Sequence, residues 1–215
     1  MAAEMTYFKY PRTPHLPYTQ TKTADDKVLS SDEHFYAFDS VVVMEKMDGE
    51  NTTVYPDGKC HARSLNSEHA EYHSWLMNYI QSWFYLIPEK HHVCGEYLYA
   101  RHSIAYNNLK SYFYGFSLWE GPECKDWNET ISVFSDLGIV SVPVLYIGKY
   151  SADIVKRLFD DVVKAGGEGV VVRNIGSFHR DDFMFNVAKC VRANHVQTTK
   201  HWSQQQIVKN DLEMD

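Results

Sequence analysis

One stretch of the chain reads Val41-Val42-Val43-Met44-Glu45-Lys46-Met47-Asp48-Gly49-Glu50-Asn51. Its apolar, β-branched start is typical of a buried strand, and Asp48-Gly49 is typical of a tight turn. Lys46 would then lie where a core strand meets a turn. Buried lysines are rare and costly, but they serve as nucleophiles when desolvation or nearby cations lower their pKa. Taken alone, the short pattern favours a simpler interpretation, in which Lys46 extends to the surface from a strand end.

Length and composition indicate a globular chain. Its 215 residues, 44% of them hydrophobic, suit one sizeable domain with its own core. No apolar run approaches the roughly 18 residues of a membrane span, and no signal peptide is recognisable. The four cysteines are widely spaced without a Cys-x-x-Cys pair, which favours reduced thiols and a cytoplasmic location. The net charge of −7 argues mildly against a broad nucleic-acid surface but leaves room for a local basic groove.

The two ends of the chain are expected to be irregular. Residues 11–17 contain three prolines, which argues against a helix or a central strand. We expect an extended arm with aromatic anchors there, followed by a polar loop around residues 21–33. Residues 203–215 are polar and acidic, and we expect a tail that forms a frayed helix.

Between the ends, strands dominate over helices. A hairpin with a Pro-Asp-Gly turn at residues 56–58 would place the strand that holds Arg63 beside the strand that follows Lys46. Strands are expected over residues 41–46, 51–55, 59–65, 93–99, 111–120, 139–147, 168–173 and 183–191, and helices over 68–87, 128–136 and 152–164. This order predicts an α+β fold with antiparallel sheets around one cleft. The common glycine-rich phosphate-binding motifs are absent from the sequence.

Five short motifs combine charged or aromatic residues with apolar strands. They are Glu45-Lys46-x-Asp48-Gly49, Gly95-Glu96, Tyr114-Gly115-Phe116-Ser117-Leu118, Glu168-Gly169-Val170-Val171-Val172-Arg173 and Val187-Ala188-Lys189-Cys190-Val191-Arg192. In this order they resemble the covalent nucleotidyltransferase superfamily, and among its members the phage-type ATP-dependent RNA ligases. The resemblance extends from the N-terminal arm to about Trp202. It implies a nucleotidyltransferase (ATP-grasp-like ligase) fold, with antiparallel sheets flanked by helices around a central ATP cleft.

The resemblance also implies roles for individual residues. Lys46 would attack the α-phosphate of ATP to form lysyl-AMP, and Lys189 would hold that phosphate while negative charge develops on it. Glu96 would accept a hydrogen bond from a ribose hydroxyl. Arg63 would reach ribose or phosphate, and Phe116 would stack on adenine.

Three assignments stay open from the sequence. The alternation of the strand does not separate Phe116 from the alternatives Phe113 and Tyr114. The family often has a second lysine two residues after the first in its last motif, but this chain has valine there, so Arg192 is an uncertain substitute among the nucleotide-binding residues. Arg173 is either functional or an exposed strand end.

A divalent metal ion is also implied. The carboxylates of Glu45 and Asp48 would raise the pKa of Lys46. A bound metal and the cations Lys189, Arg192 and Arg63 would lower it. Mg²⁺, or Mn²⁺ in its place, would be held through water and phosphate oxygens as well as by Asp48 and Glu168. Glu45 is counted with the nucleotide-binding residues.

The resemblance predicts the substrate and the domain organisation in broad terms. The expected reaction joins RNA 5′-phosphate and 3′-hydroxyl ends, with a DNA-nick ligase, a guanylyltransferase or an inactive nucleotide- or RNA-binding module as alternatives. We expect a nucleotidyltransferase domain over residues 1–202, since too few residues follow Arg192 for the OB-fold that many relatives append. Residues 194–202 mix basic and aromatic side chains that either contact RNA or only connect the last strand to the tail.

Overall fold

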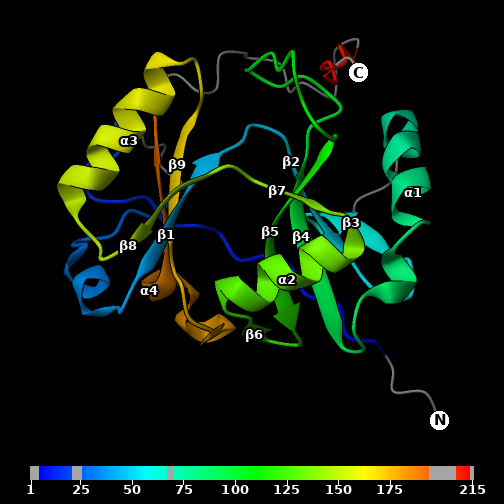
Figure 1. The fold of residues 1–215 in the computed structure, drawn as a ribbon, viewed down its shortest axis with the longest axis horizontal. Helices are drawn as coiled ribbons and strands as arrows, with labels where there is room; N and C mark the ends of the chain where they lie inside the picture. Colours follow the sequence, from blue (N-terminus) through cyan, green and yellow to red (C-terminus); the bar gives the residue numbers. More distant parts are fainter. Residues whose placement is uncertain (1–4, 21–25, 67–69, 194–206, 214–215) are drawn as a thin grey trace.

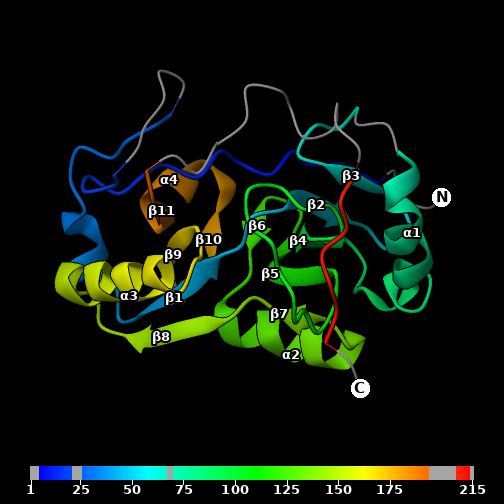
Figure 2. The same ribbon diagram turned by 90° about the horizontal axis from the view of Figure 1, so that it is seen from above.

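The computed structural model describes residues 5–20, 26–66, 70–193 and 207–213. Two β-sheets lie side by side, with helices around them (Figures 1 and 2). Among the described residues, the pairs of named strands are antiparallel with one exception, which confirms the α+β class with antiparallel sheets. No helix in the described part of the chain combines the length and the apolar character needed to cross a bilayer.

Each sheet draws its strands from distant parts of the sequence. The smaller sheet has the order β11 (Val187–Val191), β9 (Gly169–Asn174), β1 (Val41–Lys46) and β8 (Val144–Gly148). The larger sheet has the order β10 (Phe178–His179), β6 (Glu123–Cys124), β5 (Phe113–Glu120), β4 (His91–Tyr97), β2 (Glu50–Val54) and β3 (Cys60–Ala62), and β7 (Val140–Ser141) pairs in parallel with β5. Because β1 and β2 are consecutive, the turn between them passes from one sheet to the other.

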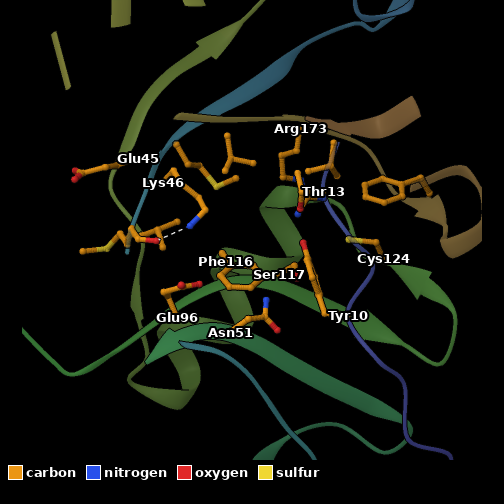
Figure 3. Close-up of a pocket in the computed structure, with 16 residues that line it drawn as sticks. Tyr10, Thr13, Glu45, Lys46, Asn51, Glu96, Phe116, Ser117, Cys124 and Arg173 are labelled. Atoms are coloured by element: carbon orange, nitrogen blue, oxygen red, sulfur yellow. Dashed lines mark hydrogen bonds between the residues drawn. The ribbon is translucent and has the colours of Figure 1, made fainter. Parts of the chain in front are cut away.

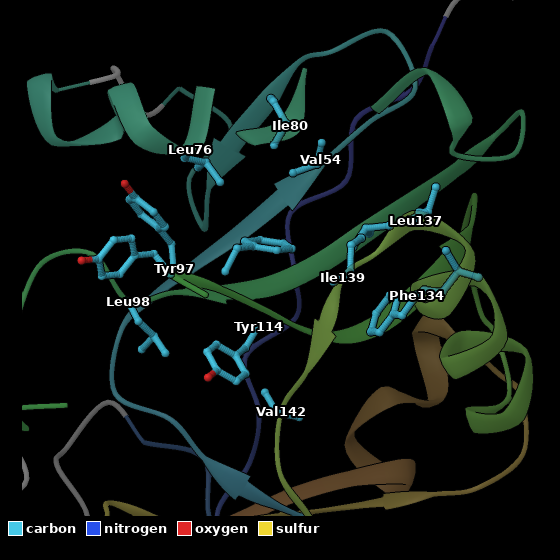
Figure 4. Packing of buried hydrophobic residues seen from close by; sticks show 14 of the residues in the cluster. Val54, Leu76, Ile80, Tyr97, Leu98, Tyr114, Phe134, Leu137, Ile139 and Val142 are labelled. Atoms are coloured by element: carbon cyan, nitrogen blue, oxygen red, sulfur yellow. The ribbon is translucent and has the colours of Figure 1, made fainter. Parts of the chain in front are cut away.

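The helices pack on these sheets through apolar side chains. The α-helices are α1 (Ser74–Ile80), α2 (Trp127–Leu137), α3 (Ala152–Lys164) and α4 (Phe183–Asn186), and the 3₁₀ turns are η1 (Glu33–Ala37), η2 (Glu71–His73), η3 (Phe84–Leu86) and η4 (Arg180–Asp182). Gly138 ends α2 in the left-handed conformation, and the Ser151 side chain caps α3. Figure 4 shows Leu76 of α1 and Phe134 of α2 within the main core cluster.

Both faces of β1 are buried, which explains its unbroken apolar run. Val41 and Val43 belong to a cluster with residues of α3, whereas Val42 and Met44 belong to the main core cluster. Side chains alternate along a strand, so Lys46 shares the face of Val42 and Met44. This is the face that β1 turns toward the larger sheet.

The helix predicted over residues 68–87 is shorter in the structure. Among residues 70–87, which are the described part of this range, only α1 is α-helical, and the 3₁₀ turns η2 and η3 flank it. Trp83 has a φ of −145°, outside the helical region, and its side chain is only 2% exposed. The chain bends at Trp83, and the aromatic side chains on both sides of the bend reach the core. The three- and four-residue spacing in the sequence did not reveal this bend.

Two predicted strands are interrupted. In residues 139–147, Pro143 separates β7, which pairs with the larger sheet, from β8, which pairs with the smaller one. Proline has no N–H for a strand ladder, so the chain changes sheets here. In residues 183–191 the first four residues form α4, because the Asn186 side-chain amide donates to the Asp182 carbonyl at 2.9 Å and closes a helical turn.

The N-terminal arm is extended, as predicted, but the tail is not helical where it is described. Residues 207–213 run beside the chain that follows β4, and Asn210 is fully buried there, donating to the Leu98 carbonyl at 2.8 Å. The frayed helix is therefore wrong for these residues. The remainder of that prediction, and the proposed contact of residues 194–202 with RNA, lie outside the described residues.

Candidate functional site

Lys46 ends β1 and points into a pocket that both sheets line (Figure 3). Its Nζ donates to Glu168 Oε2 at 3.0 Å and to the Met47 carbonyl at 2.8 Å. Glu168 is 5% exposed and directly precedes β9, whose Gly169 pairs with Lys46. The structure thus joins two charged residues that lie more than a hundred positions apart in the sequence.

Gly169 allows β11, the strand that carries Lys189, to lie close to β9. A Cβ atom at this position would overlap the Cys190 carbonyl, and the φ of +155° is one that other residues rarely adopt. Only a glycine therefore fits between Glu168 and the β9–β11 ladder.

Lys189 lies on the same face of the smaller sheet as Lys46. Across β9, Lys189 pairs with Val171, which in turn pairs with Met44, so these residues form one row. Lys46 is two positions beyond Met44 on β1, and both lysines line one hollow. Burial, followed by the like charge of Lys46, lowers the pKa of Lys189.

The larger sheet contributes Glu96 and Asn51, which are paired neighbours on β4 and β2. Glu96 Oε1 accepts a hydrogen bond from the Gly49 N–H at 3.0 Å, which ties the turn after β1 to β4. Asn51 Oδ1 is buried without a hydrogen-bond partner among the described residues, and its side chain points into the pocket (Figure 3). Sequence reasoning missed Asn51, although it closes the stretch that contains Lys46.

A β-bulge brings Phe116 into the pocket. Gly95 pairs with Gly115, whereas the preceding Cys94 pairs with Ser117, so Phe116 is the extra residue of β5. The consecutive residues Phe116 and Ser117 consequently both line the pocket, which simple alternation forbids. The alternatives Phe113 and Tyr114 lie in the core cluster instead.

Two of the predicted nucleotide-binding side chains are not directed into this pocket. Glu45 is among the residues that line the pocket, but it alternates with Lys46 along β1 and its carboxylate points away from the pocket in Figure 3. Arg192 follows β11 and lines a different hollow, which Glu45 also lines. The strand pleat therefore separates Glu45 from Lys46 in spite of their adjacency in the sequence.

Two arginines lie at the border of the pocket. Arg63 follows β3, is half-buried, and lines the hollow that Lys46 and Lys189 share. Arg173 is 2% exposed and donates to the Lys125 carbonyl at 2.9 Å, so the exposed strand end considered from the sequence is wrong. Arg173 also lines the pocket of Lys46, a position that its place in the valine run did not reveal.

The carboxylates around Lys46 control its charge. Burial lowers the pKa of Lys46, but Glu168, Glu96 and Asp48 together outweigh this effect, so that the pKa lies above its usual value. Lys46 is therefore protonated at neutral pH when these groups alone surround it. Any chemistry that requires a neutral amine has to begin with the loss of that proton.

From the raised pKa of Glu96 we predict that the stability of the fold depends on pH. Burial raises the pKa of Glu96 from 4.5 to about 7, although Lys46 opposes the shift. Between these two values the folded chain retains a proton that the unfolded chain has lost, so stability falls as pH rises through this window. Across it, wild type should lose about 3 kcal/mol relative to Glu96→Gln, which does not titrate and can still accept from Gly49. Urea unfolding of both proteins between pH 4.5 and 7.5 measures this difference, and parallel stability curves would contradict it.

The predicted metal ligands have other partners in the structure. Asp48 Oδ2 accepts hydrogen bonds from the Ser103 N–H, the Ser103 hydroxyl and the Ile104 N–H at 2.7, 2.6 and 3.0 Å, and Glu168 is paired with Lys46. Within the described ranges, no group of three acidic, histidine or cysteine side chains is arranged to hold a metal. A divalent ion here would rely on phosphate oxygens and water in addition to Asp48 or Glu168, a ligand set that Mg²⁺ accepts.

Comparisons with known proteins identify a family and similar folds. The RNA ligase family model matches residues 39–191, which is most of the chain. An archaeal ATP-dependent RNA ligase (form 1) has a TM-score of 0.62 and 17% identity, covering 89% of this chain and 50% of its own. The Naegleria gruberi RNA ligase with PPi has a TM-score of 0.55 and 16% identity over 90% of this chain and 63% of its own.

A mutant of the Naegleria gruberi ligase with ATP and Mn is similar as well, with a TM-score of 0.53 and 13% identity over 89% of this chain and 64% of its own. The present chain thus spans about half to less than two thirds of the length of these structures. At sequence identities this low, the comparison shows similarity of fold only. The comparison with curated proteins gave no match.

Proposed function

The chain belongs to the RNA ligase family, and we propose that it is an ATP-dependent RNA ligase whose nucleotidyltransferase fold binds ATP between its two sheets. The observation that carries this proposal is the amine of Lys46, held 3.0 Å from Glu168 in a pocket that Glu96 and Phe116 also line. Phosphoryl transfer depends mainly on positioning and charge neutralisation, which such a lysine and its surroundings can supply.

The proposed reaction has three steps. In the first, the deprotonated Nζ of Lys46 forms a bond to the α-phosphorus of ATP while the bond to the bridging oxygen breaks and pyrophosphate leaves. In the second, an oxygen of an RNA 5′-phosphate attacks the same phosphorus, and the P–N bond breaks to return the electron pair to Lys46. In the third, an RNA 3′-hydroxyl attacks the 5′-phosphate, and AMP leaves.

The remaining residues would each contact a different part of the nucleotide. Glu96 would accept from a ribose hydroxyl, and Phe116, which the β-bulge turns into the pocket, would stack on adenine. Lys189 and Arg63, which line the adjoining hollow, would hold phosphate oxygens. A divalent ion, when bound, would neutralise phosphate charge.

The comparisons support the same nucleotide chemistry. The Naegleria gruberi structures are described with PPi, which is a product of the proposed first step, and with ATP, which is its nucleotide substrate, together with Mn. For the present chain, Mg²⁺ or Mn²⁺ would serve together with ATP. The RNA substrate follows from the family and from the motif order in the sequence.

Labelling tests the proposal directly. The protein is incubated with α-labelled ATP and Mg²⁺, denatured and separated by electrophoresis, and a parallel sample receives α-labelled GTP. We expect acid-labile label from ATP and little from GTP. Subsequent addition of 5′-phosphorylated RNA should transfer the label to the RNA.

Three outcomes would contradict parts of the proposal. Labelling by GTP alone would indicate a guanylyltransferase. Transfer to nicked DNA but not to RNA ends would indicate a DNA ligase. ATP binding without covalent label, in protein shown to be folded and not already adenylylated, would indicate a binding module.

A further inference from the structure

The N-terminal arm is built into the smaller sheet beside Lys189. The Lys189 N–H donates to the Pro14 carbonyl at 2.9 Å, and the Leu16 N–H donates to the Lys189 carbonyl at 2.8 Å. On the other side of the arm, the His15 N–H donates to the Lys27 carbonyl at 2.7 Å. The arm is therefore an added strand with a fixed position, and its side chains have a defined relation to the pocket.

This arm carries a basic surface. A hollow of about 530 Å³, here called the arm hollow, is lined by five basic residues and three uncharged ones, and by no acidic residue. Its basic residues are Lys9, Arg12, Lys27, Arg63 and Arg180. Such a concentration of positive charge contrasts with the net charge of −7 of the whole chain.

Four of the five cations of the arm hollow are positioned by the fold and have no ion pair with a carboxylate of the described residues. These four are Lys9, Lys27, Arg63 and Arg180. Arg180 donates instead to the Lys9 carbonyl, which anchors the arm. Burial, followed by the like charge of Arg12, lowers the pKa of Arg63. A surface that gathers like charges in this way suits an anionic ligand.

The arm hollow continues into the candidate active site. Arg12 and Arg63 line both the arm hollow and the neighbouring hollow that contains Lys46 and Lys189. The basic surface therefore begins beside the lysine that would carry AMP and extends outward along the arm to Lys9.

We propose that the arm hollow binds the phosphate backbone of the RNA strand whose 5′-phosphate receives AMP from Lys46. This inference rests on the proposed function and adds the path of the substrate. A 5′-phosphate that attacks at Lys46 leaves its following nucleotides to run outward, and the arm offers cations along one such direction. Contacts to phosphates position a strand without reading its sequence, so the arm would hold the RNA strand without selecting particular bases.

The test removes two cations that line the arm hollow but line neither the pocket of Lys46 nor the hollow that Lys46 and Lys189 share. Lys9 and Lys27 are both exposed, and the double variant Lys9→Gln/Lys27→Gln leaves the backbone pairing of the arm intact. The control Lys149→Gln/Lys164→Gln makes the same charge change at exposed positions that line none of the hollows described above. For each protein, binding of 5′-phosphorylated single-stranded RNA is measured between about 50 and 200 mM salt. Self-adenylylation with ATP alone and transfer of AMP from the adenylylated protein to RNA are measured in parallel.

We expect the slope of log affinity against log salt to become shallower by about 1.4 in the arm variant, roughly 0.7 for each phosphate that a lysine no longer neutralises, and to stay unchanged in the control. Transfer of AMP at low RNA concentration should fall in the arm variant alone, whereas self-adenylylation involves no RNA and should proceed as in wild type.

An arm variant with the same salt slope and transfer rate as the control would overturn the inference while leaving the ligase intact. Slower self-adenylylation with a raised KM for ATP would also overturn it, because the arm would then hold the triphosphate of ATP. A wild-type protein that never becomes adenylylated would instead refute the proposed function itself.

Discussion

Lys46→Ala should reduce covalent labelling by α-labelled ATP by at least about a thousandfold, because the amine that forms the bond to phosphorus is removed. The same variant should still seal RNA that already carries a 5′-adenylate, since this last step uses no lysyl-AMP. Denaturing electrophoresis measures the first activity, and ligation of pre-adenylylated RNA measures the second. Loss of label together with retained sealing would separate the nucleophile from the rest of the site.

Lys46→Arg is the control for charge. Alanine leaves the buried carboxylate of Glu168 without its cation, which destabilises the fold, whereas arginine retains a positive charge near Glu168. Arginine stays protonated in proteins and cannot supply a neutral amine. We therefore expect a folded, unlabelled protein, as shown by an unfolding midpoint close to that of wild type. Substantial labelling of Lys46→Arg would contradict the assignment of Lys46 as the nucleophile.

The sequence predicted the elements whose cause is local. The β-branched run of β1 forms a strand because both of its faces are buried, and the Pro-Asp-Gly turn joins β2 to β3, with the Tyr55 N–H donating to the Lys59 carbonyl at 3.0 Å. The caps of α2 and α3 also depend on a few adjacent residues. In these cases a short window of sequence contains the whole physical reason for the structure.

The features that the sequence left open or did not reveal depend on contacts between distant residues. Phe116 enters the pocket because β5 contains a bulge opposite β4, and alternation within β5 alone cannot register an extra residue. Adjacency in the sequence suggested that Glu45 acts with Lys46, although the pleat turns it away. Likewise, the prolines of the arm predicted an extended chain but not its pairing with Lys189, which lies more than 170 positions away in the sequence.

Lys189→Met should slow self-adenylylation by about 10²–10³-fold, the usual cost of removing one group that stabilises developing charge in a phosphoryl or acyl transfer site. Methionine approximates the apolar stem of lysine, so the row that Lys189 forms with Val171 and Met44 keeps its packing. The loss then reflects the missing cation. Because the α-phosphate gains charge as Lys46 attacks, the effect should fall on the rate constant more than on the KM for ATP.

Two further variants distinguish catalysis from structure. Lys189→Arg keeps the charge and should recover part of the rate, whereas Lys125→Met removes a lysine whose partners Glu120 and Glu129 lie outside the pocket, and should leave adenylylation unchanged. Rapid-quench measurement of the labelling rate compares all of them. If Lys189→Met altered only the KM for ATP, Lys189 would bind ground-state phosphate and would not act on the transition state. Lys189→Met could instead lower the unfolding midpoint and the labelling rate together, with no recovery of either in Lys189→Arg. Lys189 would then have a structural role in the pairing of β11 with the arm.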